Sequence, residues 1–228
     1  MRTIAGQQGL AIQLIDQSPI ACDDIVFRDL VAAHAAVTDG QLIGGSGTNG
    51  EVVGIRNTPN ITTIAVSTLD VQSCYSAIAN GIQQIHSTRF LPPDAIAMHP
   101  RRWGWFLSLL DGNQRPLFLP AANSPMNVAG VQDVVASQQV VGQIQGLPVI
   151  TDPNIPVNLG AGNNEDVIFV MRASDRVLWE DDIRARVLPE VTAQNLTVVL
   201  QIYNYFAFTA SRFPQSVVEI SGMTAPTF

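Results

Sequence analysis

The sequence predicts a globular α+β protein, and three observations lead to that prediction. Hydrophobic residues make up 46% of the 228 residues and charged residues 14%, which gives ample apolar material for a core and too little charge for a disordered chain. Apolar residues recur at helical spacing early in the chain, and they alternate at strand spacing late in the chain. Strands at both ends with mixed segments between them favour a discontinuous architecture, in which the middle of the chain forms an inserted domain.

The first expected elements are a strand and a long helix. Apolar residues alternate over 10–17, which predicts a strand, and Ser18-Pro19 breaks it. Asp23 and Asp24 then stand where acidic residues favour a helix N-terminus. Four apolar residues follow at spacings of four, three and four: Val26, Leu30, Ala33 and Val37. We therefore expect a helix over residues 22–42, with Gly40 as a plausible stop.

The rest of the chain alternates between predicted helices, strands and polar loops. Helical spacing predicts helices over 69–86 and 99–110. Short apolar or alternating segments predict strands over 95–98, 147–151, 167–171, 183–187, 196–208 and 216–220. The strand over 183–187 should be half-buried, with Arg184 and Arg186 on a charged outer face.

Charge and composition exclude several classes of partner. The formal net charge is -7, and all 12 basic residues are arginine. The one adjacent basic pair is Arg101-Arg102, so we expect no tight direct binding of nucleic acid. No apolar run is long enough to cross a bilayer, the first residues do not form a signal peptide, and a chain without lysine supplies none for an isopeptide bond.

No constellation of residues in the sequence favours catalysis or ligand binding. The glycine motif over 45–50 matches a dinucleotide fingerprint, but a helix precedes it and no helix follows, so we interpret it as an interdomain turn. His34, His86 and His99 lack a second metal ligand at close spacing. We predict no catalytic, cofactor-binding or metal-binding residue, no cofactor, and no enzymatic activity.

The remaining candidate residues have structural interpretations that we favour. The carboxylates over 180–182 are expected on a solvated strand edge or on a charged surface that meets a neighbouring subunit. The tryptophans Trp103 and Trp105 are expected in the core, with interface anchoring as the second possibility. The thiols of Cys22 and Cys74 are expected to be buried and reduced.

Several segments, in order, resemble the major capsid proteins of tailed bacteriophages, which have the HK-97 fold. Gln13–Leu30 is similar to the segment that leads into the family's spine helix, and Leu42–Ile55 to its glycine-rich turn. Ala97–Leu119 resembles the family's Asn-Pro and Trp motif, with His99 in place of the usual Asn. Further likeness lies in Gly146–Val149, Asp175–Arg186 and Thr197–Phe213. The resemblance covers most of residues 10–222.

The resemblance implies a specific architecture and function. It implies a peripheral domain over 1–43 and 167–228, with the spine helix at about 22–42 on a β-sheet, and an axial domain over 44–166. Loops 119–129 and 154–166 are candidates for lining a five-fold or six-fold axis. The implied function is a structural shell subunit of a phage or prophage, which self-associates into pentameric or hexameric capsomers. The implied partners are itself, full-length capsid subunits and the portal, without a membrane; the implied location is the virion capsid, and the bacterial cytoplasm before assembly.

The start of the sequence departs from the family pattern. Family members carry an N-terminal arm and an extended loop, and this sequence begins near the returning limb of that loop. We therefore expect monomers or isolated capsomers rather than closed shells. Two alternatives remain: an encapsulin-like compartment shell protein, or a truncated capsid-like protein with an interference or regulatory role.

Overall fold

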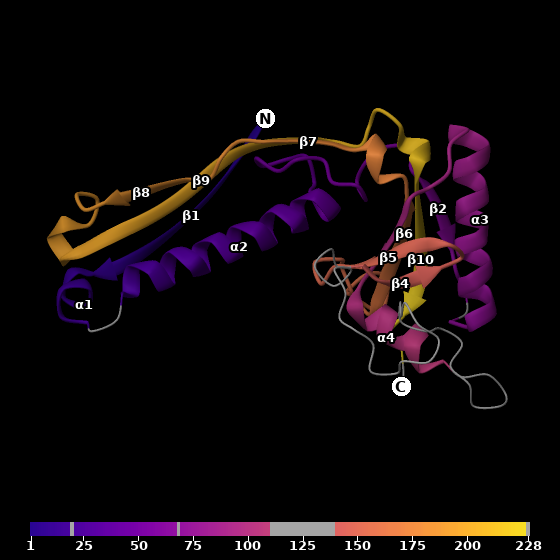
Figure 1. Cartoon of the computed structure of the whole chain (residues 1–228), viewed down its shortest axis with the longest axis horizontal. Coiled ribbons are helices and arrows are strands. Elements are labelled where there is room, and N and C mark those ends of the chain that lie inside the picture. Colours follow the sequence, from indigo (N-terminus) through magenta and orange to yellow (C-terminus); the bar gives the residue numbers. More distant parts are fainter. Residues whose placement is uncertain (19–20, 68, 110–139, 227–228) are drawn as a thin grey trace. The chain divides into compact units, whose positions relative to one another are not determined.

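The computed structural model describes residues 1–18, 21–67, 69–109 and 140–226 (Figure 1). The chain divides into two compact units, and the backbone passes between them three times. Unit 1 comprises Met1–Asn57 and Val177–Thr209, and unit 2 comprises Thr58–Arg176 and Ala210–Phe228.

Unit 1 contains one antiparallel sheet built around a long central strand. Its strands are β1 (Arg2–Ala11), β7 (Val177–Glu180), β8 (Arg184–Leu188) and β9 (Thr197–Thr209). One edge of β9 pairs with β1 over ten residues, from Arg2 opposite Phe206 to Ala11 opposite Thr197. The other edge of β9 pairs with β7 and β8 in succession. Thus β9 organises the whole sheet, and β1 lies at its margin.

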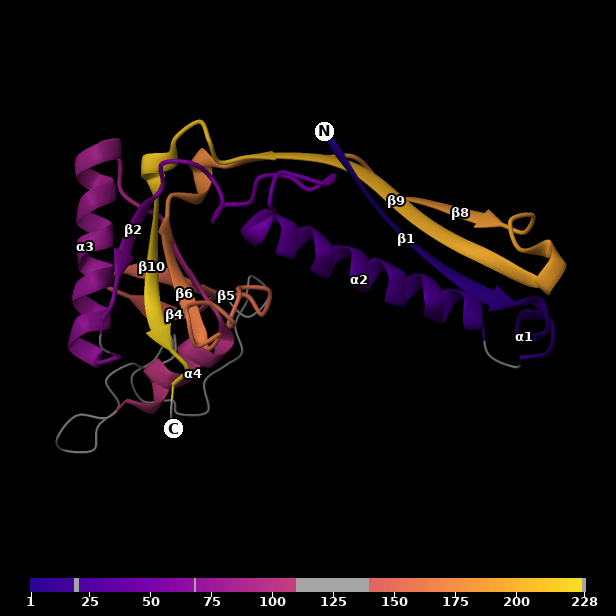
Figure 2. The same ribbon diagram turned by 180° about the vertical axis from the view of Figure 1, so that it is seen from behind.

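A long helix lies along one face of this sheet. The helices of unit 1 are α1 (Ile12–Gln17), α2 (Cys22–Gly44) and the 3₁₀ turn η3 (Ala193–Asn195). Figures 1 and 2 both show α2 running along β1 and β9. The buried residues of α2 are His34, Thr38 and Ile43, so its contact with the sheet follows a narrow stripe. The helix predicted over 22–42 is confirmed, although Gly40 does not end it.

Two sequence-based predictions about unit 1 are wrong in detail. Of the strand predicted over 10–17, only Leu10 and Ala11 belong to β1, because pairing with β9 ends at Ala11 and Ile12–Gln17 forms α1. The strand predicted over 183–187 exists as β8, but it is not half-buried: Arg184–Val187 are exposed on both faces. The helix α2 packs on β1 and β9, so neither face of β8 is covered.

Unit 2 contains a mixed sheet with the strand order β2-β10-β6-β3-β5-β4. Its strands are β2 (Thr62–Ala65), β3 (Ala95–Met98), β4 (Val140–Ile144), β5 (Leu147–Thr151), β6 (Glu165–Met171) and β10 (Val217–Thr224). The pairs β2–β10 and β3–β5 are parallel, and the others are antiparallel. The central strands β3 and β6 are almost entirely buried, which explains their continuous apolar sequences.

The helices of unit 2 complete a single core with the sheet. They are α3 (Val71–Arg89), α4 (Pro100–Ser108) and the 3₁₀ turns η2 (Ala173–Asp175) and η4 (Pro214–Ser216). The Asp70 carboxylate caps α3 by accepting from Gln72 N–H, and Pro100 begins α4. Side chains from α3, α4 and five strands form one buried cluster, which includes Ile78, Ile96 and Phe106.

The boundaries of the two units differ from those expected for the peripheral and axial domains. We expected 1–43 and 167–228 to form one domain and 44–166 the other. However, β6 pairs with β3 and β10, which places both β6 and β10 in the sheet of unit 2. Residues 44–57, in contrast, fold back on the end of α2 and stay in unit 1.

Candidate assembly surfaces

The three histidines lie in different elements and different environments. His34 is buried on α2, His86 is exposed near the end of α3, and His99 caps α4. The Nδ1 atom of His99 accepts a hydrogen bond from Arg101 N–H at 3.0 Å. Burial, followed by the charge of Arg101, lowers the pKa of His99, although Asp166 and Asp152 oppose this shift. Within the described residues, no three metal-ligating side chains cluster, and no helix is both long and apolar enough to cross a membrane.

A buried polar network fixes α2 on the sheet of unit 1. Asn204, fully buried on β9, donates from Nδ2 to Glu180 Oε1 at 3.0 Å, so its Oδ1 is left as an acceptor. His34 Nε2 lies 2.8 Å from that Oδ1, and we therefore assign the proton to Nε2. The network joins α2, β9 and β7 without an unsatisfied group, as a buried amide requires.

The glycine motif over 45–50 forms a tight turn at the end of α2, but it lies within unit 1 and is not the interdomain turn that we expected, because the chain passes to unit 2 only after Asn57. Gly47 N–H bonds to Val52 O, and Gly54 N–H bonds to Gly45 O. A Cβ at Gly45 would collide with the carbonyl oxygens of Gln41 and Val52, so the loop requires glycine there. Because no helix follows, these amides do not form a phosphate-binding helix N-terminus.

The adjacent arginines of the sequence bind a carboxylate inside unit 2. Asp166 is fully buried and accepts from Arg101 Nε at 2.6 Å and from Arg102 Nε at 2.9 Å. Arg102, itself fully buried, also donates to Met223 O and Thr224 O. The Arg101-Arg102 pair therefore joins α4, β6 and β10 and presents no basic patch on the surface.

The other structural interpretations have mixed outcomes. Trp103 and Trp105 lie in the core, as predicted. Cys74 is fully buried and free, but Cys22 is only partly buried, with its thiol 3.3 Å from Ser18 Oγ. Loop 154–166 is held by Arg101, which donates to the carbonyl oxygens of residues 157 and 164, and loop 119–129 lies outside the described residues. A role of either loop at a symmetry axis stays a prediction.

Apolar side chains on the surface are concentrated in unit 1. Among the described residues, thirteen of the sixteen exposed large hydrophobic side chains belong to unit 1, which is the smaller unit. They come from α1, α2, β7, β8 and the adjoining loops, and include Leu14, Ile25, Trp179, Val187 and Val191. Exposed apolar side chains that gather on one unit make it a candidate interaction surface.

The outer face of the unit 1 sheet carries arginines of β8 that stack diagonally on tyrosines of β9. Arg186 stacks over Tyr203 at 4.9 Å and Arg184 over Tyr205 at 5.6 Å, and the two tyrosine rings meet edge to face. Asp181 accepts from Arg184 Nη2 at 2.7 Å. Tyrosine, tryptophan and arginine are the residues most enriched where protein surfaces bind tightly, so this face is a second candidate surface for assembly.

A protein-family model matches most of the chain. The model of the phage capsid family matches residues 1–213. No curated protein matches the sequence significantly.

Solved structures share the fold at low sequence identity. The chain is similar to the capsid of an empty GTA particle computed with C5 symmetry, with a TM-score of 0.74 and 13% identity over 98% of this chain and 74% of that chain. A chain from Mycobacterium phage Adephagia gives a TM-score of 0.64 and 14% identity over 92% and 67% of the two chains. The holo-SrpI encapsulin complex from Synechococcus elongatus PCC 7942 gives 0.61 and 11% over 99% and 75%.

At such low identities these structural matches establish the fold alone. That fold is the α+β fold of HK-97-type capsid subunits. The family match over most of the chain goes further than the fold. The chain therefore belongs to the phage capsid family, whose members are structural shell proteins and not enzymes.

Proposed function

We propose that this chain is the shell subunit of a phage or prophage capsid and that its copies associate laterally into capsomers of five or six. Unit 1, with a long helix on a sheet, corresponds in this proposal to the peripheral domain of the family. Unit 2 corresponds to the axial domain. Assembled copies belong to the virion capsid and, before assembly, to the bacterial cytoplasm.

The observation that carries this proposal is the apolar surface of unit 1. One helix partly covers one face of its sheet, and β8 is uncovered on both faces. Apolar side chains of this kind are stable in water only as scattered residues or when another surface covers them. Neighbouring copies of the same chain are the most economical source of that surface, because many modest contacts then repeat around a closed shell.

The charge of the chain suits a container wall. A net charge of -7 repels the phosphate backbone of packaged DNA, and the adjacent basic pair is used inside unit 2. We therefore propose that the wall does not grip nucleic acid tightly. By analogy with the family, full-length capsid subunits and the portal are further partners.

The test is to measure the mass of the purified chain by light scattering after size exclusion, followed by negative-stain microscopy of each peak. Rings of five or six copies support the proposal, whereas closed particles of uniform size favour the compartment described below. A monomer at every concentration, up to hundreds of micromolar, contradicts it. Dilution of any ring should release monomers, since each single contact is weak.

A second candidate is a cargo compartment, which the likeness to the SrpI encapsulin complex favours. Such a compartment forms closed particles of uniform size that hold a second protein. Mass spectrometry of particles purified from a native host distinguishes the two: one stoichiometric enzyme inside indicates a compartment, and portal or tail proteins indicate a phage.

A further inference from the structure

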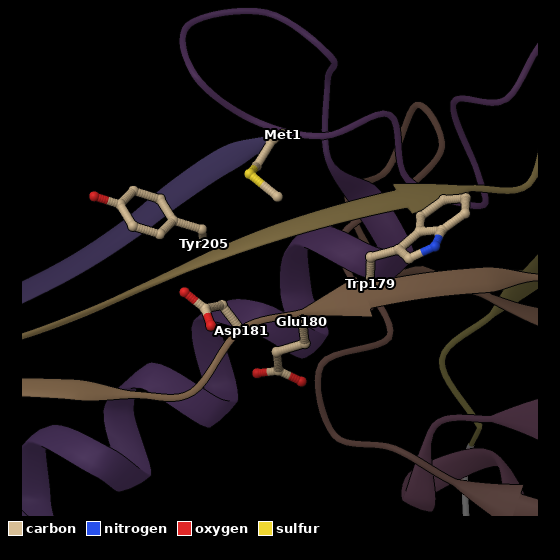
Figure 3. Close-up of a pocket in the computed structure, with 5 residues that line it drawn as sticks. All are labelled: Met1, Trp179, Glu180, Asp181 and Tyr205. Atoms are coloured by element: carbon tan, nitrogen blue, oxygen red, sulfur yellow. The ribbon is translucent and has the colours of Figure 1, made fainter.

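The pocket at the start of β1 does not favour a particular ligand. Figure 3 shows its lining, which consists of Met1, Trp179, Glu180, Asp181 and Tyr205. The Glu180 carboxylate already accepts from Asn204, and the Asp181 carboxylate from Arg184. The volume of about 230 Å³ also lies below the roughly 300–1,000 Å³ of sites for small-molecule ligands. The reactive chemistry of unit 1 lies instead in the turn that follows α2.

The sequence contains two Asn-Gly dipeptides, Asn49-Gly50 and Asn80-Gly81. Asparagine is a thermolabile residue, and before glycine its side chain can cyclise without an enzyme. The backbone nitrogen of the glycine attacks the side-chain carbonyl carbon of the asparagine. Glycine favours this attack, because it has no Cβ to hinder the approach and its backbone reaches many conformations. The two dipeptides are chemically the same, so the structure around each decides whether it reacts.

Asn49 and Gly50 are the two central residues of an exposed turn. Their φ angles are 51° and 93°, and Glu51 N–H donates to Thr48 O at 2.9 Å. Positive φ at both central residues is the requirement of a type I′ turn, which explains why Asn-Gly stands here. No hydrogen bond of the described residues uses Gly50 N–H, and a Cβ at Gly50 would meet no atom within 4 Å. The turn therefore presents the dipeptide in open space.

The second dipeptide lies in the middle of α3 and is held by its surroundings. In a helix each N–H donates to the carbonyl four residues earlier, so the nitrogen of Gly81 is engaged. Gly81 is buried, and a Cβ there would lie 3.3 Å from Val218 and 3.5 Å from Val170. The Asn80 side chain is exposed, as is that of Asn49. Solvent access to the amide therefore does not distinguish the two sites, whereas the backbone does.

We propose that Asn49 is a site of spontaneous deamidation in the folded chain and that Asn80 is protected. The Gly50 nitrogen loses its proton and bonds to Cγ of Asn49, and the side-chain nitrogen of Asn49 leaves as ammonia. Water then opens the resulting five-membered imide at either carbonyl, which gives aspartate or isoaspartate. The reaction consumes a water molecule, releases ammonia, and needs no oxidant, reductant or cofactor.

Local opening explains why the two sites differ. Ring closure requires a change in the backbone of Asn49, since the closed turn fixes both of its dihedral angles. An exposed turn with few apolar contacts opens at little cost in free energy, whereas the middle of a core helix opens only together with its packing partners. The side chains of α3 belong to the main buried cluster of unit 2, so we expect opening at Asn80 to be rare.

Deamidation would change both the charge and the backbone of this loop. Glu51 accepts from Ser46 Oγ at 2.6 Å and from Ser46 N–H at 2.9 Å, and these bonds lower its pKa. A new carboxylate at position 49 adds a like charge close to Glu51. Isoaspartate also inserts a methylene into the backbone, so Glu51 N–H no longer faces Thr48 O. We expect residues 45–54 to loosen at the end of α2.

Peptide mapping of the full chain tests the proposal. Trypsin cuts this lysine-free chain at Arg28, Arg56 and Arg89, which puts the two dipeptides in separate peptides. After incubation at physiological temperature and mildly alkaline pH, mass spectrometry should show deamidation at Asn49 at least about tenfold faster than at Asn80. In urea that unfolds the chain, the two sites should react at similar rates. Equal rates in the folded chain would overturn the proposal. A rate at Asn49 more than about tenfold below its rate in urea would also overturn it, because the turn would then protect the site.

A matched variant links the reaction to the loop. Asn49→Gly keeps a residue that tolerates the positive φ, but it has no side-chain amide to lose. This variant should not form the acidic species that ion exchange resolves from the aged unmodified chain, and its hydrogen exchange over residues 45–54 should not rise with age. Asn80→Ala should change neither result. An acidic species that persists in Asn49→Gly would assign the modification to another residue. None of these readouts depends on self-association, so they stand apart from the proposed function.

Discussion

The two units of the chain differ in how many of their apolar residues they bury and how many they expose. Within the described residues, unit 2 buries twenty-four hydrophobic residues and exposes three large ones. Unit 1 buries eight and exposes thirteen. Both contain a helix on a sheet, so the element types do not explain the difference.

The difference follows from how many layers each unit has. In unit 2, α3, α4 and the six-stranded sheet enclose one cluster, and the central strands are covered on both sides. In unit 1, a single helix covers part of one face, and the opposite face is open. A domain usually needs two well-packed layers around a core. Unit 2 therefore has the core of an independent domain, whereas unit 1 has an exposed apolar surface that the proposed self-association would cover.

The largest expected effect is the loss of the buried ion pair in unit 2. Asp166→Ala leaves the fully buried Arg102 without its counter-ion, which should cost about 3–5 kcal/mol of unfolding free energy. Urea unfolding monitored by the fluorescence of the buried Trp103 and Trp105 measures it. The control Asp152→Asn changes a partly exposed carboxylate. A cost for Asp166→Ala within about 1 kcal/mol of that control would contradict an independent, tightly packed unit 2.

An intermediate effect is expected from the polar network of unit 1. Asn204→Ala removes both the acceptor for His34 and the donor to Glu180, at a cost of about 1–3 kcal/mol. Because unit 1 has little other core, the loss should appear as faster amide hydrogen exchange throughout α2. The control Gln201→Ala alters the opposite face of β9. If exchange rises equally in unit 2, the two units unfold together and the comparison fails.

Sequence patterns predicted the fold best where one chain supplies all the packing. The short strands over 95–98 and 147–151 match β3 and β5 to the residue, because both pair on two sides within the sheet of unit 2 and turn or loop residues bound them. The prediction was poorest in unit 1. Over Arg2–Ala11 only Ile4 and Leu10 are buried, so β1 has no clear alternation to detect.

The predicted half-burial of β8 failed for a related reason. The alternation of Ile183, Ala185 and Val187 with charged residues is genuine, but the chain alone covers neither face. We infer that the pattern is adapted to surfaces of other copies. The buried polar contacts within each unit also escaped prediction, because His34 and Asn204 are 170 positions apart, and Arg102 and Asp166 are 64 apart. No local spacing links such pairs.

A smaller effect should depend on pH through the cap of α4. The pKa of His99 is lowered, chiefly by burial, so folding favours the neutral ring that accepts from Arg101 N–H. The stabilisation of the fold by the neutral ring of His99 is therefore complete above the unfolded pKa of about 6.5, and it is lost as the pH falls through the pKa of the folded state. The variant His99→Asn keeps a strong N-cap on α4, but its side chain does not titrate. The cap contributes about 1 kcal/mol at most to the free energy of unfolding. Thermal unfolding at pH 7.5 and pH 5 should show a smaller pH difference for the variant; an unchanged difference would assign the effect to other groups.

The smallest effect on stability should accompany a clear effect on association. Val187 on β8 is 57% exposed, so Val187→Ser should change the unfolding free energy by no more than about 0.5 kcal/mol. If other copies cover the exposed surface of unit 1, however, the same substitution removes an apolar side chain from a contact that repeats in the oligomer. The concentration at which oligomers form should then shift. Tyr75→Ser is the matched control, because Tyr75 is 45% exposed on unit 2. Light scattering over a dilution series measures the midpoint of association, the concentration at which half of the chains are in oligomers. This midpoint should change for Val187→Ser and not for Tyr75→Ser. Equal midpoints for both variants would mean that exposed apolar residues on unit 1 have no special role, and that the contrast between the units concerns folding alone.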